Sequence, residues 1–65
     1  MPKQVAPPRF LRLPAVLDLV GVTRSTIYRW MDAGEFPRQI SVGGNTVVWL
    51  ESSVTEWMEK QIRGA

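Results

Sequence analysis

Two segments with helical apolar spacing lie close together in this chain, separated only by residues 21–23. The first segment, 15–20, follows Pro14, which fits the first turn of a helix because the N–H that proline lacks would have no partner there. Gly21 stands where a helix ends with positive φ, and Thr23 is placed to cap the next helix by accepting a hydrogen bond from an early backbone N–H. A helix, a short turn containing glycine and a second helix are typical of the helix-turn-helix motif.

Each predicted helix has one apolar face. In the first helix this face carries Val16, Leu19 and Val20. The second helix is predicted over residues 24–33 and ends at Gly34. Its residues divide into a buried face of Ile27, Trp30 and Met31, an opposite face of Ser25, Arg29 and Asp32, and flanks of Arg24, Thr26 and Tyr28.

Alternating apolar and polar residues predict strands over 9–13 and 38–42, and β-branched and aromatic residues predict a strand over 46–50. The last two form a hairpin with a two-residue turn at either Gly43-Gly44 or Gly44-Asn45. We expect the core face of the hairpin to be the one that holds Trp49. Its members are Ile40, Val42, Val47 and Trp49, and the opposite face carries Gln39, Ser41, Val48 and Leu50.

Residues 53–56 (Ser-Val-Thr-Glu) have the form of a capping box, although Ser52 is an alternative cap, and predict a last helix over 54–63 that ends at Gly64. The element order predicts an α+β fold, a winged helix-turn-helix with three short helices and a two- or three-stranded antiparallel β wing. We expect this domain over residues 9–65, preceded by a flexible Pro-rich arm, 1–8.

The composition excludes several classes of function. The chain has 65 residues and contains neither Cys nor His, which removes the disulfide, the thiol nucleophile and the most usual metal ligands. No spacing pairs a nucleophile with a base, so we expect no enzyme activity, cofactor, metal or small-molecule substrate. No apolar run approaches the roughly 20 residues of a membrane span, so we expect a cytoplasmic protein without membrane contact.

Several segments resemble the AlpA-like family of phage regulators, which are related to prophage excisionases and to MerR-like DNA-binding domains. They are 10–14 (Phe-Leu-Arg-Leu-Pro), 21–31 (Gly-Val-Thr-Arg-Ser-Thr-Ile-Tyr-Arg-Trp-Met), 34–37 (Gly-Glu-Phe-Pro) and 42–44 (Val-Gly-Gly), followed by Trp49, Ser52, Val54 and Trp57. The resemblance implies a winged helix-turn-helix that binds DNA and either activates integrase transcription or directs prophage excision. Family members often carry basic residues at the positions of Asn45 and Leu50, so the wing of this chain is poorer in cations.

The residues expected to contact DNA gather on the second helix. Arg29, with Ser25 one turn earlier, would contact base edges in the major groove, where its planar fork suits guanine O6 and N7. The alternative is a solvated Arg29 that pairs with Asp32 or with another nearby acid. Arg24 and Thr26 lie at the start of this helix, where backbone N–H groups favour a phosphate, or else they form a solvated first turn.

Four further candidates are predicted around this helix. Tyr28 would either donate its hydroxyl to a phosphate or cover the edge of the core, and Arg38 would either contact a phosphate or stay solvated. Asn45 at the wing tip would either touch DNA or serve only the turn, because Asn tolerates positive φ. Arg12 would contribute to a basic N-terminal surface. The three tryptophans are expected to pack in the core rather than stack on bases.

The expected function is sequence-specific binding of double-stranded DNA by a regulator of a prophage or other mobile element, located at the bacterial nucleoid when bound. The alternative is a protein-interaction module that keeps the winged fold without binding DNA. Further copies of the chain on DNA and an integrase are the expected protein partners. Val48 and Leu50, which face away from the predicted core, would either join neighbouring copies or cover the strand near Phe10.

Overall fold

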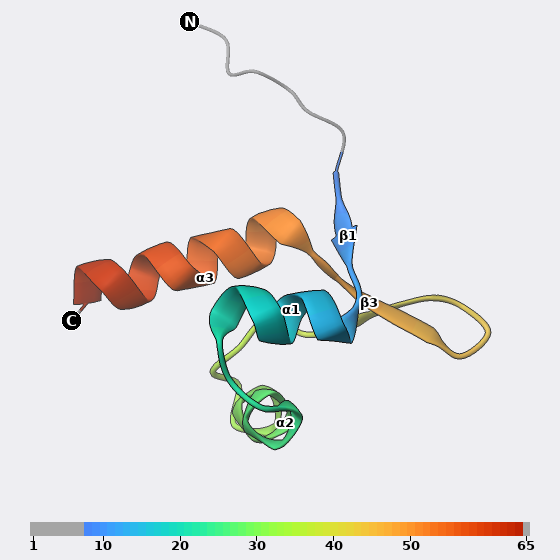
Figure 1. Cartoon of the computed structure of the whole chain (residues 1–65), viewed down its shortest axis with the longest axis horizontal. Helices are drawn as coiled ribbons and strands as arrows, with labels where there is room; N and C mark the ends of the chain where they lie inside the picture. Colours follow the sequence, from blue (N-terminus) through green and yellow to red (C-terminus); the bar gives the residue numbers. More distant parts are fainter. Residues whose placement is uncertain (1–7, 65) are drawn as a thin grey trace, which may run out of the picture.

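A computed structural model describes residues 8–64, so all of the expected arm except Pro8 lies outside the described residues. The elements are β1 (Phe10–Leu11), α1 (Leu13–Val20), α2 (Arg24–Asp32), β2 (Ile40–Gly43), β3 (Thr46–Leu50) and α3 (Glu51–Gly64). Three helices and one antiparallel sheet of three strands confirm the predicted α+β fold and are consistent with a winged helix. Both α1 and α3 run away from the sheet, and α2 is seen end-on below α1 (Figure 1).

The central strand of the sheet is β3, which pairs with β1 on one side and β2 on the other. Leu11 of β1 lies opposite Trp49, and Phe10 lies opposite Leu50. Successive side chains of a strand point to opposite faces, so Leu11 and Trp49 share the core face while Phe10 and Leu50 share the outer face. The predicted third strand is therefore present, but it is shorter than residues 9–13 because the chain enters α1 at Leu13.

The predicted faces of Ile40 and Val42 in the hairpin are wrong. Ser41 lies opposite Val47 and Gly43 lies opposite Thr46, so Val42 is an extra residue in β2, a β-bulge. Because side chains alternate along a strand, the bulge moves Ile40 to the outer face, where it lies opposite Val48. Ile40 and Val42, which were expected in the core, are accordingly 39% and 45% exposed.

The hairpin turn consists of Gly44 and Asn45. Gly44 takes the left-handed conformation, with a φ of 50°, and no residue other than glycine has positive φ within the described range 8–64. Asn45 therefore does not occupy the turn for its tolerance of positive φ, and this part of the prediction is wrong. The preceding glycines carry the unusual backbone angles instead.

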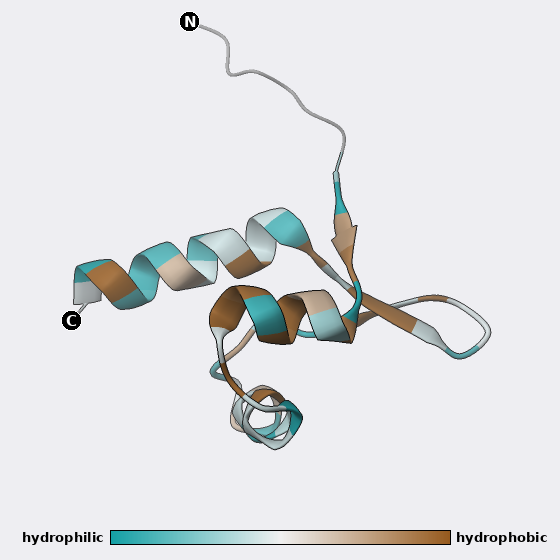
Figure 2. Cartoon of the chain, in the orientation of Figure 1, coloured by the Kyte–Doolittle hydropathy of each residue, from teal (hydrophilic) through white to brown (hydrophobic). Residues whose placement is uncertain are grey.

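The core lies where the sheet meets the three helices. Its fully buried side chains come from one residue each of α1, α2, β3 and α3, namely Val16, Ile27, Trp49 and Val54. The indole N–H of Trp49 donates to the backbone carbonyl of Pro37 at 3.2 Å, so the one polar group of this side chain is satisfied. Figure 2 shows the corresponding brown, apolar segments on α1 and on the strands.

Helix α1 begins earlier than predicted, and its apolar face differs accordingly. The side chains that it packs into the core follow the i, i+3, i+4, i+7 pattern: Leu13, Val16, Leu17 and Val20. Leu19, which was expected on this face, is 43% exposed. Gly21 ends the helix as predicted, with a φ of 82° and its N–H bonded to the Leu17 carbonyl at 2.7 Å.

Helix α3 starts directly after β3, at Glu51 instead of residue 54. The predicted capping box is therefore wrong, since Ser52 and Ser53 lie inside the first turn. A backbone contact explains the early start: the Glu51 N–H donates to the Arg9 carbonyl of the neighbouring strand segment at 2.8 Å. The first N–H of the helix thus has a partner from the sheet and needs no side-chain cap.

Candidate nucleic-acid interface

Helix α2 is held in place by one apolar face. Ile27 is fully buried and Met31 is 6% exposed, while Trp30 packs against the same core. The predicted buried face of this helix is confirmed. At its end, Gly34 has a φ of 74° and the Glu35 N–H donates to the Trp30 carbonyl at 2.7 Å, which turns the chain back towards α3. The opposite side of α2 is left in solvent.

The exposed side of α2 brings together four of the predicted contact residues. These are Arg24, Ser25, Tyr28 and Arg29, which follow the i, i+1, i+4, i+5 pattern of a single helical face. All four are exposed, Tyr28 by 37%. Two guanidinium groups, a primary hydroxyl and a phenol thus share one surface. Such a surface offers donors to the acceptor groups of a nucleic acid.

Thr26 is placed differently from these four residues, because it is half-buried and its hydroxyl is engaged. Its Oγ1 lies 3.0 Å from Oγ1 of Thr23 in a hydrogen bond between the two hydroxyls. Thr23 precedes the helix with extended backbone angles, as a capping residue does, but its side chain makes no bond to a backbone N–H of α2. The predicted capping interaction is therefore wrong, since the Thr23 hydroxyl pairs with Thr26.

The arginines of α2 have no acidic partner within residues 8–64. In that range the only ion pair within 4.0 Å joins Arg9 and Glu51, at 3.6 Å. The alternative of an Arg29–Asp32 pair is accordingly not formed. Arg24 and Arg29 are exposed and form no ion pair within 4.0 Å in residues 8–64, which leaves both guanidinium groups available to an anionic partner.

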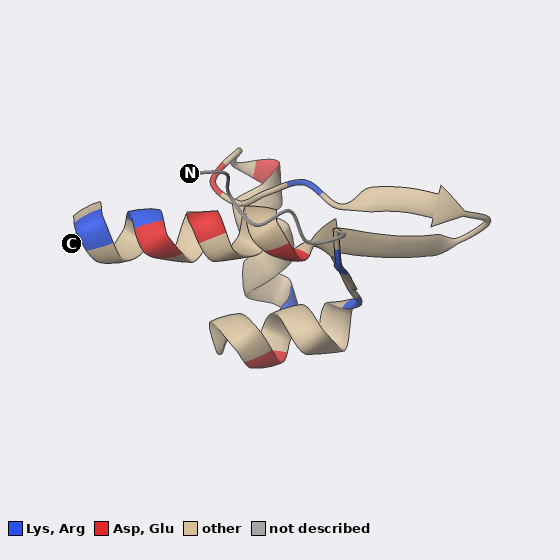
Figure 3. Ribbon diagram, turned by 90° about the horizontal axis from the view of Figure 1, so that it is seen from above, with Lys and Arg blue, Asp and Glu red and all other residues tan. Residues whose placement is uncertain are grey.

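The remaining candidates lie on other elements. Arg12 immediately precedes α1, Arg38 lies in the segment before β2, and Asn45 is in the hairpin turn; all three are exposed. Figure 3 shows that the β2–β3 hairpin is free of charged residues, while cationic positions occur at the β1–α1 junction, on α2 and just before β2. A wing of this kind contributes no cation to phosphate binding, in agreement with the expectation drawn from Asn45.

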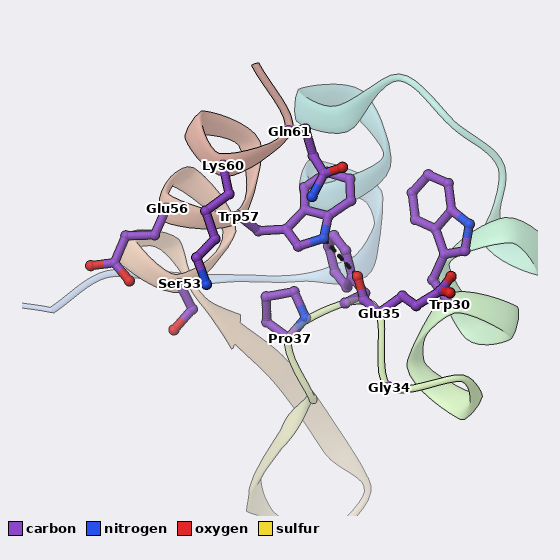
Figure 4. A pocket seen from close by; sticks show the side chains of 10 residues that line it. Trp30, Gly34, Glu35, Pro37, Ser53, Glu56, Trp57, Lys60 and Gln61 are labelled. Carbon is purple, nitrogen blue, oxygen red and sulfur yellow. Dashed lines mark hydrogen bonds between the residues drawn. The ribbon is translucent and has the colours of Figure 1, made fainter. Parts of the chain in front are cut away.

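Sequence reasoning missed an open hollow between the end of α2 and α3. The rings of Trp30, Phe36 and Trp57 pack against one another at its floor, with centroids 4.9–6.2 Å apart. Around them lie the side chains of Glu35, Pro37, Ser53, Glu56, Lys60 and Gln61 (Figure 4). The one indication of this cluster in the sequence is that Phe36 lies between Gly34 and Pro37. The turn at Gly34 brings the Phe36 ring back to Trp30.

The tryptophans pack within the protein, as expected. Trp49 is fully buried, and Trp30 and Trp57 contact each other and the core. Within residues 8–64, no group of three or more Asp or Glu side chains is arranged to hold a metal ion. In the same range, no helix combines the length and apolarity needed to cross a membrane.

Comparison with known proteins places this chain in a family. Residues 9–62 match the family model described as "Prophage CP4-57 regulatory protein (AlpA)". A protein of Enterobacteria phage P4, "Uncharacterized protein ORF88", is 55% identical over 56 residues, which cover 86% of this chain but only 64% of the phage protein. The "DNA-binding transcriptional activator AlpA" of Escherichia coli (strain K12) is 34% identical over 61 residues, covering 85% of this chain and 87% of that protein.

Proposed function

Since the chain belongs to the AlpA family of prophage regulatory proteins, we propose that it is a DNA-binding regulator whose helix α2 enters the major groove of double-stranded DNA. The observation that carries the proposal is the exposed face of α2, where two arginines without acidic partners within residues 8–64 lie beside Ser25 and Tyr28. The name of the E. coli relative, a DNA-binding transcriptional activator, supports the same function.

Each residue of this face has a role that follows from its position. Arg29 lies one turn into the helix and contacts a base edge, preferentially O6 and N7 of a guanine, with Ser25 beside it. Arg24 at the first position of α2 binds a phosphate, assisted by the first backbone N–H groups, for which Thr23 provides no side-chain cap. Tyr28 donates its hydroxyl to the DNA backbone.

The other predicted residues are secondary contacts in this proposal. Arg12, which precedes α1, and Arg38, which precedes β2, bind phosphates, and Asn45 approaches a neighbouring groove through hydrogen bonding alone. Thr26 supports the start of the helix through its bond with Thr23 and does not contact a base. The uncharged hairpin makes the wing a minor contributor to affinity, because phosphate neutralisation dominates the strength of most protein–DNA complexes.

The regulatory output of the bound protein is one of two. The relative's name favours activation of transcription, for which an integrase gene is the proposed target. The second candidate is direction of prophage excision together with an integrase, which requires the same DNA-binding surface at different sites. Footprinting on the host element separates the two outputs. Protection of a promoter supports the activator, and protection within the arms of a recombination site supports the excision factor.

The proposal is tested first by retention on immobilised duplex DNA at low salt. We expect retention that is lost as salt rises, because cations on α2 displace counterions from the phosphates. Duplexes enriched from a random library should then yield a consensus sequence. If the protein flows through the column at low salt, it does not bind DNA, and the alternative of a protein-interaction module takes the place of this proposal.

A further inference from the structure

The hollow between the end of α2 and α3 takes no part in the proposed DNA contact. Trp30 at its floor belongs to the buried face of α2, whereas Ser25 and Arg29 lie on the opposite face of that helix. A duplex that contacts Ser25 and Arg29 therefore approaches the domain from the other side of α2. The hollow has a volume of about 870 Å³, which is comparable to that of ligand-binding clefts and is enough for several side chains.

The floor of the hollow presents aromatic surface to solvent. Trp30 and Trp57 are half-buried, and their rings are tilted by 37° with centroids 5.4 Å apart. Phe36, the third ring of the cluster, is only 4% exposed, so the two indoles and the half-buried Pro37 form the accessible part of the floor. The face of an indole attracts cations, and the planar guanidinium of arginine in particular stacks on it.

The rim of the hollow is more negative than positive. It has two carboxylates, those of Glu35 and Glu56, and one ammonium group, that of Lys60, and all three residues are exposed. Figure 4 shows the Glu35 carboxylate on the side of Trp30 and the Glu56 carboxylate on the other side, where Lys60 also lies. The one ion pair that forms within residues 8–64 involves neither of these carboxylates. Such a rim repels the phosphates of DNA and favours a cationic partner.

We propose that the hollow binds a short extended segment of a partner protein, in which an arginine is next to an apolar residue. The arginine of the partner stacks on Trp30 and pairs with the Glu35 carboxylate, while its apolar neighbour packs on Trp57 and Pro37. Arginine fits better than lysine, because its flat guanidinium can stack on an indole and donate two hydrogen bonds to a carboxylate at the same time.

This contact would give the domain a protein-binding surface behind the helix that is proposed to enter DNA. A partner held there is brought to the DNA site without competing for the arginines of α2. That consequence rests on the proposed function, whereas the binding of the segment itself does not. Because the hollow is open and an extended segment loses conformational freedom on binding, we expect a dissociation constant of about 0.1–1 mM for an isolated peptide.

The test uses the full chain without DNA and the blocked pentapeptide Ala-Leu-Arg-Pro-Ala as the probe. The indole N–H resonances of Trp30 and Trp57 should shift during the titration, and that of the fully buried Trp49 should stay in place. The same peptide with glutamate instead of arginine should bind about 10-fold more weakly, because it loses the stacking and the ion pair and meets two carboxylates.

Variants at the rim test the assigned contacts. Glu35→Gln should weaken the binding of the arginine peptide about 2- to 5-fold, and Lys60→Ala should strengthen it, since a like charge is removed. Glu59→Gln is the matched control, because Glu59 is exposed on α3 but does not line the hollow, and it should leave the affinity unchanged. All three positions are exposed, and circular dichroism verifies that the variants are folded.

Three results would overturn the inference. They are unmoved resonances of Trp30 and Trp57 up to about 10 mM peptide, equal binding of the arginine and glutamate peptides, and equal losses in Glu35→Gln and Glu59→Gln. Retention on duplex DNA is measured separately on the same proteins. If the peptide binds as expected but DNA is not retained, the peptide site stands and the proposed function falls. If DNA is retained but the peptide does not bind, only the peptide site falls.

Discussion

The indole N–H of Trp57 donates a 2.7 Å hydrogen bond to the backbone carbonyl of Glu35, 22 positions earlier in the chain. This bond ties α3 to the segment that immediately follows α2. The Trp57 ring also packs edge-on against Phe36, with centroids 4.9 Å apart, and lies 5.4 Å from Trp30 of α2. The orientation of α2, and with it the direction of its exposed arginines, is thus fixed from the side opposite to the proposed DNA surface.

Replacing Trp57 by Phe should lower the free energy of unfolding by about 1–2 kcal/mol, because the hydrogen bond to Glu35 and part of the ring packing are lost. In a domain of this size the midpoint of thermal unfolding falls by roughly 4–8 °C for each kcal/mol. Tyr28→Phe is the control. Like Trp57→Phe, it removes one polar group from an aromatic side chain, but Tyr28 lies on the exposed side of α2. Equal midpoints for both variants would contradict the role assigned to Trp57.

Replacing Gly21 by Ala should destabilise the fold by about 1–2 kcal/mol. The cause is the backbone alone: Gly21 has a φ of 82°, and an added Cβ would meet no atom within 4 Å. Gly64→Ala makes the same chemical change in equally open space but without positive φ, so it should not destabilise the protein. Chemical denaturation of both variants measures the difference, and a Gly21→Ala protein as stable as Gly64→Ala would rule out backbone strain.

The parts of the fold that the sequence predicts are those set by local pattern. Gly21 ends α1 and Gly34 follows the end of α2 because positive φ favours glycine, and the spacing of Ile27 and Met31 assigns the buried face of α2. The exposed set of Arg24, Ser25, Tyr28 and Arg29 follows directly, since it is the remainder of the same helix. Most of the candidate site can therefore be derived from the helical periodicity of residues 24–32.

The parts that the sequence does not predict depend on backbone pairing that no local residue pattern encodes. The bulge at Val42 reverses the face of Ile40, and no local pattern distinguishes it from a regular hairpin with the same turn. The early start of α3 depends on the bond from the Glu51 N–H to the Arg9 carbonyl, 42 positions away in the chain, which replaces the expected serine cap. The second error arises because tertiary pairing satisfies a backbone group that local rules assign to a side-chain cap.

The logarithm of the DNA-binding constant should fall linearly with the logarithm of the salt concentration. The slope is set by the number of phosphates that arginines neutralise. With Arg12, Arg24 and Arg38 each neutralising about one phosphate, and Arg29 on a base edge, the slope of log K against log salt is about −3. Arg24→Ala should make the slope shallower by about 1, whereas Asn45→Ala should leave it unchanged, because the wing holds no cation. Fluorescence anisotropy at several salt concentrations gives these slopes. A slope that Asn45→Ala changes as much as Arg24→Ala would contradict the minor role of the wing.

Adding a cation to the wing provides the converse test. Asn45→Lys places a positive charge in the exposed hairpin turn, and it should strengthen binding at low salt and steepen the slope by about 1 if the wing tip lies near a phosphate. Thr55→Lys, on the exposed side of α3, introduces the same charge away from the proposed surface. Equal gains from the two variants would show that only net charge matters and that the hairpin does not approach the duplex.

The most direct measurement of the central claim is the affinity of Arg29→Ala for a duplex enriched from a random library, beside Arg63→Ala as control. Both arginines are exposed helix residues, but only Arg29 lies on the proposed face of α2. We predict that Arg29→Ala weakens binding by about 1–3 kcal/mol, roughly 5- to 150-fold, and relaxes the preference at one base pair, while Arg63→Ala changes affinity little. Unchanged binding by Arg29→Ala, or an equal loss in both variants, would contradict the assignment of α2 as the DNA-contacting helix.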